Sequence, residues 1–214
     1  MPDNNGFFKQ NQLVLLSIAL AFLIAGFVYF VGNSEPLFVK ATSQKETSHS
    51  GTPDIGGAFT MQNQNGENVT QEILLGKNTL MFFGFTHCPD ICPMSLMTVT
   101  DALAQLPEQM RENFQVIFVT IDPQRDTPEL MKEYLANFNK NYIGLSGTEA
   151  QLKDMAKKYL VYYAKNPDSH PKHYLMDHSA YIYHFNPQGS YITHYSHKID
   201  PNVLAVDIQE NFAQ

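Results

Sequence analysis

The two cysteines of this 214-residue chain, Cys88 and Cys92, lie four positions apart in the stretch HCPDICP. Thiolates are soft metal ligands, and two neighbouring thiols can also form a disulfide. Each cysteine precedes a proline, which disfavours a helical conformation at the cysteine itself. Because Pro93 suits the first turn of a helix, we expect the pair on a stiff loop at a helix N-terminus, a setting that favours thiolates.

Three kinds of chemistry are open to this pair. Two cysteines alone cannot complete a structural zinc site or an iron–sulfur cluster, whereas copper(I) accepts two thiolates and one imidazole. A redox couple is the second possibility, although the spacing is one residue wider than the familiar C-x-x-C. A passive disulfide is the third, and so short a loop would gain little stability from it. The residues favour the metal site, then the redox couple.

Other possible donors stand close to the pair in the sequence. His87 is adjacent to Cys88, and adjacent residues of an extended segment face opposite ways, so we do not expect it to join the site. Met94 and Met97 carry thioethers that copper(I) accepts. Methionine at helical spacing is more often a core residue, and we expect these two in the core.

The motif IDPQRDTP combines Asp122, Arg125 and Asp126 at the end of a predicted strand. We expect Arg125 to pair with one of the two aspartates, and docking of a partner carboxylate is the alternative. The other histidines are expected on the surface or on strand faces; they are His170, His173, His184, His194 and His197.

The cysteines fall between two predicted elements. The continuous apolar run at 79–85 is typical of a strand covered on both faces, and 114–121 is a second such run. Between them, apolar residues at helical spacing predict a helix over 93–106. Ligand sites of open α/β sheets gather at the carboxyl ends of strands, which is where the cysteines would lie.

The remaining elements complete an α/β pattern. Residues 56–70 contain turn residues between short apolar runs, which predicts a hairpin. Thr127–Pro128 marks one helix start, Thr148 with Gln151 forms a capping box for another, and Asp200–Pro201 begins the last helix. Three late strands are expected, at YLVYYA, SAYIYHF and SYITHYS. This order predicts a mixed sheet flanked by helices.

The N-terminal part has a different character. Residues 13–31 are nineteen uncharged residues, whose helical rise of about 1.5 Å each nearly matches a hydrocarbon core of about 30 Å. The stretch is longer than the apolar part of a signal peptide and lacks a small-x-small cleavage site, so we expect an uncleaved anchor. Residues 1–12 would form a short cytoplasmic leader, 32–52 a flexible tether and 53–214 the folded domain.

Composition narrows the function classes. Hydrophobic residues make up 43% of the chain, which is enough for one domain with a hydrophobic core. The net charge of −7 argues against a nucleic-acid partner. The sequence contains no Gly-rich phosphate loop, no Ser-His-Asp arrangement and no paired catalytic carboxylates.

Three motifs in order, FTHCPDICP, IDPQRDTP and LMDHSAYIYHFNPQG, resemble the SCO/SenC family of copper-binding proteins over about residues 53–214. The resemblance implies a thioredoxin-like fold, a membrane anchor and a role in cytochrome c oxidase assembly. It also implies that Cys88, Cys92 and His178 hold one copper ion, as Cu(I) or Cu(II). Asp177 would either orient His178 or support the local turn.

The expected function is therefore a copper chaperone, not an enzyme, that delivers copper to the dinuclear centre of the oxidase's copper-bearing subunit. A periplasmic copper donor and a thiol reductant are expected as further partners. The alternative is a thiol–disulfide oxidoreductase that reduces the cysteines of the same subunit. A peroxide-reducing enzyme is disfavoured because Thr86 does not give the spacing T-x-x-C. The expected location is the inner membrane, with the domain facing the periplasm or the mitochondrial intermembrane space.

Overall fold

The computed structural model describes Ala25, residues 54–170 and residues 173–212. The predicted leader and tether, and all but one residue of the predicted anchor, lie outside these residues. Within the described part of the chain, no helix is both long and apolar enough to cross a membrane. The anchor therefore stays a prediction from the sequence.

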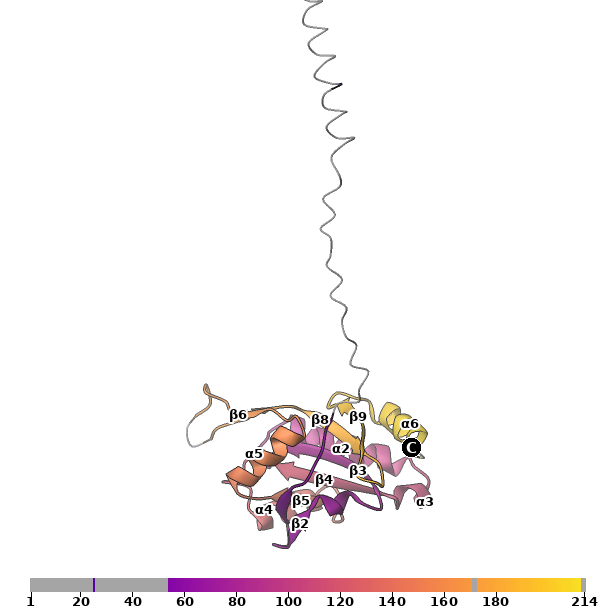
Figure 1. Ribbon diagram of the computed structural model, residues 1–214, viewed down its shortest axis with the longest axis horizontal. Coiled ribbons are helices and arrows are strands. Elements are labelled where there is room, and N and C mark those ends of the chain that lie inside the picture. Colours follow the sequence, from indigo (N-terminus) through magenta and orange to yellow (C-terminus); the bar gives the residue numbers. More distant parts are fainter. Residues whose placement is uncertain (1–24, 26–53, 171–172, 213–214) are drawn as a thin grey trace, which may run out of the picture. The chain divides into compact units, whose positions relative to one another are not determined.

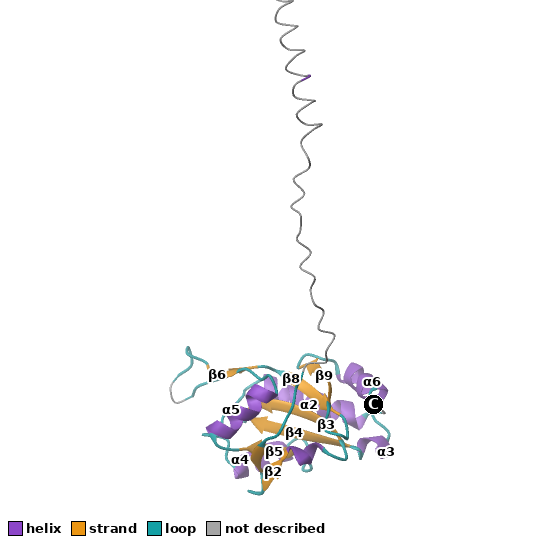
Figure 2. Ribbon diagram, in the orientation of Figure 1, coloured by secondary structure: helices purple, strands orange, loops and turns teal. Residues whose placement is uncertain are grey.

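Residues 54–170 and 173–212 form a mixed sheet with helices packed on it (Figures 1 and 2). The seven-stranded sheet has the order β2-β1-β5-β4-β3-β8-β9, and β6 and β7 form a separate ribbon. The strands are β1 Thr60–Asn63, β2 Asn68–Thr70, β3 Asn78–Gly84, β4 Phe114–Thr120, β5 Ile143–Ser146, β6 Tyr163–Lys165, β7 Met176–His178, β8 Tyr181–Phe185 and β9 Tyr191–Ser196. The helices are η1 Gln71–Leu74, α2 Ile91–Ala104, α3 Glu108–Arg111, α4 Pro128–Ala136, α5 Glu149–Lys158 and α6 Pro201–Glu210.

Strands β3 and β4 form the centre of the sheet. Every residue of β3 is buried, as a continuous apolar run predicts for a strand covered on both faces. The two strands pair in parallel from Asn78 opposite Phe114 to Gly84 opposite Thr120. Their carboxyl ends therefore lie together at one edge, and the cysteine loop leaves from that edge.

Neighbouring residues of β3 serve opposite faces of the sheet. Phe82 packs against Phe118 of β4, and Tyr134 of α4 packs on Phe118 from the same side. Phe83 packs instead against Tyr159, the residue that ends α5. Helices α4 and α5 thus cover different faces, and the core lies on both sides of β3 and β4.

Most of the predicted elements are confirmed, including the first hairpin, both central strands and the capping box at Thr148. The prediction of one strand through YLVYYA is wrong in its first half. Helix α5 runs to Lys158 with Tyr159 as its C-cap, and pairing with β7 begins at Tyr163. Strand β5 and ribbon strand β7 were not predicted, because three or four residues are too few to show a clear alternation.

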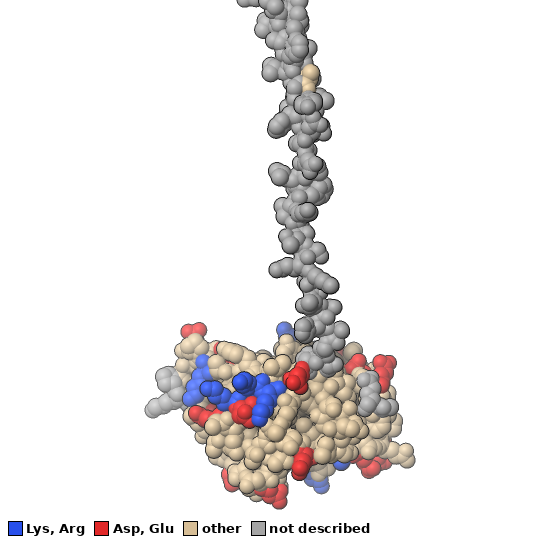
Figure 3. Space-filling view, viewed as in Figure 1, with Lys and Arg blue, Asp and Glu red and all other residues tan. Residues whose placement is uncertain are grey.

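Basic side chains gather on the face of the molecule shown in Figure 3, and helix α5 carries the lysines Lys153, Lys157 and Lys158. Lys153 and Lys157 are four residues apart and therefore project from the same side of the helix. Lys158 is engaged elsewhere, because it pairs with Asp154 and donates a hydrogen bond to the carbonyl of Ala58. Figure 3 also shows acidic side chains among these lysines.

The end of α5 has an unusual residue. Leu160 adopts a left-handed conformation, with φ of 53°. Its amide donates to the carbonyl of Lys157 at 3.4 Å, and the amide of Val161 donates to that of Ala156 at 2.8 Å. These two bonds form a Schellman motif, in which the left-handed position usually belongs to glycine. The Leu160 side chain is 60% exposed, so core packing does not compensate for the strained backbone.

Leu160→Gly should therefore stabilise the fold. A left-handed conformation costs a non-glycine residue about 1 kcal/mol or more, and glycine avoids this cost. We expect a rise of about 1 kcal/mol in the free energy of unfolding, measured by chemical denaturation. Leu75 is the matched control, since it is similarly exposed at 55% but has a φ of −81°. Leu75→Gly should lower stability, and a loss of stability in Leu160→Gly would contradict the assigned strain.

His184 of β8 is a strand residue, as expected, but its side chain is fully buried. Its Nε2 lies 3.1 Å from Oδ1 of Asn78, and its Nδ1 lies 3.5 Å from the hydroxyl of Tyr195. The ring also lies 5.9 Å from that of Phe114. Burial disfavours the charged imidazolium and lowers the pKa of His184 to about 4.

This pKa makes stability depend on pH. Between about pH 6.5 and pH 4 the unfolded chain binds a proton at His184 that the folded chain does not, so stability falls as the pH falls. The loss should be on the order of 3 kcal/mol, from urea unfolding at a series of pH values. His184→Gln should flatten this slope whatever its effect on absolute stability. The exposed His194→Gln should leave the slope as it is, and an unchanged slope in His184→Gln would rule out His184 as its source.

Candidate metal centre

The site is built on a buried carboxylate at the edge where β3 and β4 end. Asp126 is fully buried and accepts hydrogen bonds from the amide and hydroxyl of Thr86, at 3.0 and 2.6 Å. It accepts a third bond from the hydroxyl of Thr120 at 2.6 Å. The amide of Cys88 then donates to the carbonyl of Phe85 at 3.2 Å. The turn that carries the first cysteine is therefore fixed by the fold.

The two cysteines meet at the start of α2. Cys88 lies in the turn before the helix and is partly exposed, while Cys92 is the second helical residue and is fully buried. The amide of Cys92 donates to the sulfur of Cys88 at 3.4 Å. Asp90, the N-cap residue, makes no side-chain capping bond. The sulfur of Cys88 thus satisfies a free amide of the first turn, as a capping side chain would.

The predicted position of the pair needs one correction. Cys88 does lie on a loop at a helix N-terminus, but Cys92 belongs to the helix. The helix begins at Ile91, two residues before Pro93. Proline is tolerated there because the amides of the first turn have no partner within the helix.

A glycine makes room for the buried sulfur. A Cβ atom on Gly84 would lie 2.8 Å from Sγ of Cys92, which is closer than such atoms can approach. Gly84 is the last residue of β3, and it also faces the rings of Phe82 and Phe118. Any larger residue would therefore displace the sulfur or the packing around it.

The third side chain comes from a distant part of the sequence. His178 ends β7, and its Nε2 lies 3.8 Å from Sγ of Cys92, 86 positions earlier in the chain. Its Nδ1 lies 3.0 Å from the carbonyl oxygen of Ser179. A carbonyl only accepts, so Nδ1 carries the proton and Nε2 presents its lone pair to the sulfur. The rings of Phe82 and Phe85 hold the imidazole edge-on, at 5.9 and 6.1 Å.

The pKa values of the two thiols are shifted in opposite directions. The thiol of Cys92 donates to the sulfur of Cys88, and this hydrogen bond holds the pKa of Cys88 far below that of a free thiol. Backbone amides of Asp90 and Cys92 lower the same pKa further, while partial burial acts in the opposite direction. The bond to Cys88 and burial together raise the pKa of Cys92 far above the ordinary range. The pair therefore favours the thiolate on Cys88 and the proton on Cys92.

Two sulfurs and one imidazole thus lie in one place, and this donor set suits copper(I). Among the described residues, however, no three His, Cys, Asp or Glu side chains already surround a common point in the way that a complete metal site would. The geometry brings the three predicted residues together as neighbours.

The neighbouring candidates lie elsewhere. Nδ1 of His87 faces the hydroxyl of Thr86 at 3.1 Å and the carboxylate of Asp126 at 3.6 Å. Asp177 is exposed and accepts from the side-chain amide of Asn166 at 3.1 and 3.3 Å. This contact supports the turn of the ribbon, which was one of the two expected roles of Asp177.

The prediction that Met94 and Met97 are core residues is wrong. Their side chains are 58% and 55% exposed. Helix α2 buries the side that carries Cys92, Leu96 and Val99, and the two methionines project away from it. Their spacing is helical, but the apolar face of this helix is wider than its buried face.

The predicted ion pair of Arg125 is present. Its Nε donates to the carboxylate of Asp122, which also accepts from the hydroxyl of Tyr174 at 2.8 Å. The guanidinium lies 3.6 Å from the centre of the Tyr174 ring. This cluster ties the end of β4 to the segment before β7. Sequence reasoning did not identify Tyr174 or Thr86, since neither stands in a pattern that indicates its partner.

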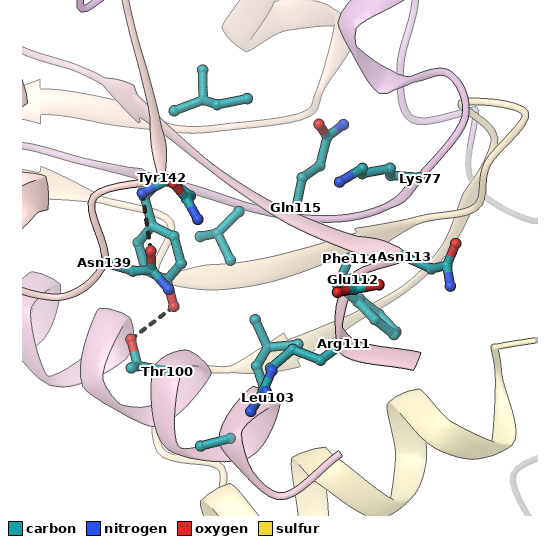
Figure 4. Close-up of a pocket in the computed structure, with 14 residues that line it drawn as sticks. Lys77, Thr100, Leu103, Arg111, Glu112, Asn113, Phe114, Gln115, Asn139 and Tyr142 are labelled. Atoms are coloured by element: carbon teal, nitrogen blue, oxygen red, sulfur yellow. Dashed lines mark hydrogen bonds between the residues drawn. The ribbon is translucent and has the colours of Figure 1, made fainter. Parts of the chain in front are cut away.

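The pocket drawn in Figure 4 lies away from these residues. Its volume is about 840 Å³, and it is lined by the starts of β4 and β5, where Tyr142 bonds to Thr100. Those strand starts are at the opposite edge from the cysteines. The lining contains no cysteine or histidine, so pocket size does not identify the metal centre.

Comparison with known proteins gives consistent matches. The family model described as SCO1/SenC matches residues 47–213. A SCO2-like protein of Rickettsia prowazekii is 42% identical over 142 residues, which is 66% of this chain and 69% of that protein. Mitochondrial SCO2 of Saccharomyces cerevisiae is 36% identical over 192 residues, 89% of this chain and 64% of that protein.

Two solved structures are similar as well. Bradyrhizobium japonicum ScoI with copper bound has a TM-score of 0.66 and 40% identity, covering 73% of this chain and 98% of that one. Yeast Sco1 with copper bound has a TM-score of 0.68 and 36% identity, covering 74% and 88%. The expected thioredoxin-like mixed α/β fold is confirmed, and copper is bound in these homologous structures.

The unequal thiols predict selective alkylation of the reduced, metal-free protein. Only a thiolate reacts readily with iodoacetamide, so Cys88 should be modified and buried Cys92 spared, as peptide mass spectrometry would reveal. The rate at Cys88 should stay nearly constant from pH 6 to pH 8, because the thiolate is already formed.

The control variant for this prediction is Cys92→Ala. It removes the thiol donor, so the pKa of Cys88 rises and its alkylation rate should increase with pH over the same range. A parent protein whose rate climbs about tenfold per pH unit would contradict the assigned acidity.

Proposed function

Because the chain belongs to the SCO1/SenC family, we propose that it binds one copper ion through Cys88, Cys92 and His178 and delivers it to cytochrome c oxidase during assembly. The observation that carries the proposal is the approach of His178 to the cysteine pair. Nε2 of His178 lies 3.8 Å from Sγ of Cys92, and Cys88 bonds to the amide of the same cysteine. Homologous structures with copper bound support the choice of metal.

The protonation of the three side chains suits capture of copper(I). The Cys88 thiolate is the ready ligand, and it is the more exposed of the two sulfurs. Binding at Cys92 requires loss of its proton, so loading releases one proton to solvent. His178 needs no deprotonation at Nε2, because its proton is held on Nδ1 by the carbonyl of Ser179.

Delivery would proceed by ligand exchange with the dinuclear copper centre of the oxidase's copper-bearing subunit. His178 belongs to the ribbon of β6 and β7, which is not part of the seven-stranded sheet. The ribbon can therefore move without breaking a hydrogen bond of the main sheet. Withdrawal of His178 would leave the copper with two thiolates and open a position for a ligand of the recipient.

The setting of this reaction follows from the sequence. A transmembrane helix at 13–31 would hold the domain at the inner membrane, on its periplasmic side or facing the mitochondrial intermembrane space. A copper donor and a thiol reductant are then the further partners, because the thiols must be reduced before they bind copper.

A second function is favoured by a separate observation. The acidic Cys88 thiolate beside the Cys92 thiol is the arrangement of a thiol–disulfide oxidoreductase, in which one cysteine attacks and the other resolves. A disulfide switch has been identified in BsSco, a Sco family relative with 27% identity and a TM-score of 0.57. The same pair could thus reduce the cysteines of the oxidase subunit as a secondary activity.

The decisive experiment is copper titration of the reduced full chain in competition with a copper(I) chelator. We expect one copper per chain, and His178→Ala should weaken binding at least about tenfold because it removes one of three ligands. The exposed His194→Ala is the matched control and should bind as the parent does. Equal copper affinity in His178→Ala and the parent would rule out the three-ligand site.

The same variant separates the two functions. Disulfide exchange needs only the two sulfurs, whereas copper transfer needs the imidazole as well. Rapid reduction of an oxidised oxidase copper domain that persists in His178→Ala, without stoichiometric copper binding by the parent, would favour the oxidoreductase.

A further inference from the structure

We propose that Leu160 and Tyr162, together with Lys153 and Lys157, form a docking surface for an acidic face of the protein that receives the copper. We call these four residues the α5 docking surface. The inference rests on the proposed function, since it names how the recipient is held beside His178.

Leu160 is the first reason. Its left-handed backbone, with φ of 53°, would suit glycine better. The side chain is 60% exposed, so it contributes little to the core in return. Strained positions that the fold does not require are concentrated at functional sites. Because the Leu160 side chain points outward there, a partner can cover it.

Tyr162 continues this surface toward the metal centre. Residues 160 to 162 alternate between exposed and buried, with Val161 turned inward and Tyr162 64% exposed. The amide of Tyr162 donates to the hydroxyl of Ser179 at 3.1 Å, and its carbonyl accepts from the amide of Ser179 at 2.9 Å. Since Ser179 follows His178 directly, the exposed tyrosine lies beside the strand that carries the proposed ligand.

The charge of the surface identifies the partner. Lys153 and Lys157 project from one side of α5, and neither has a hydrogen bond or ion pair recorded among the residues that the structure describes. Of the acidic residues of this helix, Asp154 is paired with Lys158, while Glu149 accepts a hydrogen bond from the neutral amide of Gln124 and keeps its charge, so the three lysines still outnumber the acids of α5. Two unneutralised cations on a chain of net charge −7 favour a partner that presents carboxylates.

These features fit one occupant. Exposed aromatic and leucine side chains flanked by charges are typical of a protein–protein contact, in which the apolar centre is covered and the charged rim steers the approach. The recipient would place carboxylates on the two lysines and an apolar recess over Leu160. Its own copper ligands would then face His178, since Tyr162 adjoins that residue through Ser179.

The test measures binding of the metal-free full chain, in detergent, to the metal-free soluble domain of the oxidase's copper-bearing subunit. Leu160→Ala removes most of the apolar side chain but leaves a strained, left-handed residue at position 160. Leu160→Gly removes the side chain and also relieves the backbone strain. We expect both to weaken binding about tenfold, with the thermal midpoint of Leu160→Gly equal to or above that of the parent. Leu75→Ala, an equally exposed leucine elsewhere, is the matched control and should bind as the parent does.

The lysines are tested by charge reversal. Lys153→Glu with Lys157→Glu should slow association about tenfold at 50 mM salt, and the difference should shrink at 500 mM salt. Lys140→Glu, an exposed lysine outside this surface, should have little effect. A reversal that acts equally at both salt concentrations would overturn the electrostatic part of the proposal.

Two results would overturn the docking surface as a whole. The first is that both Leu160 variants bind the oxidase domain as the parent does. The second is that these variants change self-association of the chain and leave binding to the oxidase domain unchanged. Copper affinity is measured in parallel and should be unaffected by all of the substitutions. Because docking is measured without metal, a parent that failed to bind copper would refute the proposed function alone, and the docking result would still stand on its own.

Discussion

The buried carboxylate of Asp126 is the interaction on which the site depends. A buried charge is stable only where its lone pairs are satisfied, and here Thr86 and Thr120 supply three hydrogen bonds. These two threonines follow β3 and end β4, so the carboxylate joins the two central strands at their carboxyl edge. The turn to Cys88 starts from this joint. The position of the first sulfur is therefore determined by the sheet and needs no metal to establish it.

The candidate metal centre has two parts, which are held by different elements of the fold. The cysteines rest on the central strands, where Gly84 leaves room for the Cys92 sulfur and the first turn of α2 donates to Cys88. His178 rests on a two-stranded ribbon held by the register of Tyr163 and by the cluster around Tyr174. In the proposed transfer, the thiol pair on the central strands would keep the copper, and the imidazole on the ribbon would be the ligand that leaves. A chaperone needs both properties, because its cargo must be bound and then released.

Local signals explain what the sequence predicted. The apolar runs of β3 and β4 and the capping box at Thr148 each act within a few residues, and these elements formed as expected. The prolines correctly placed Cys88 on a loop, but helix α2 begins at Ile91 and includes Cys92. The approach of His178 to Cys92 spans 86 positions and has no local signal, so only family resemblance pointed to it. Strands as short as β5 are determined by the neighbours they pair with. The exposure of Met94 likewise depends on how much of α2 the sheet covers.

At two positions near the site, the residue type is not the one that the local backbone favours. Glycine weakens a strand, yet Gly84 ends β3 because a Cβ there would strike the Cys92 sulfur. Leucine is strained in a left-handed cap, yet Leu160 occupies one and points outward. The first exception has a visible cause within the fold, since the sulfur fills the space. The second has none within the described residues, and departures of this kind are expected where function sets the residue. The proposed docking surface would supply a cause, because a partner that covers Leu160 would bury its side chain.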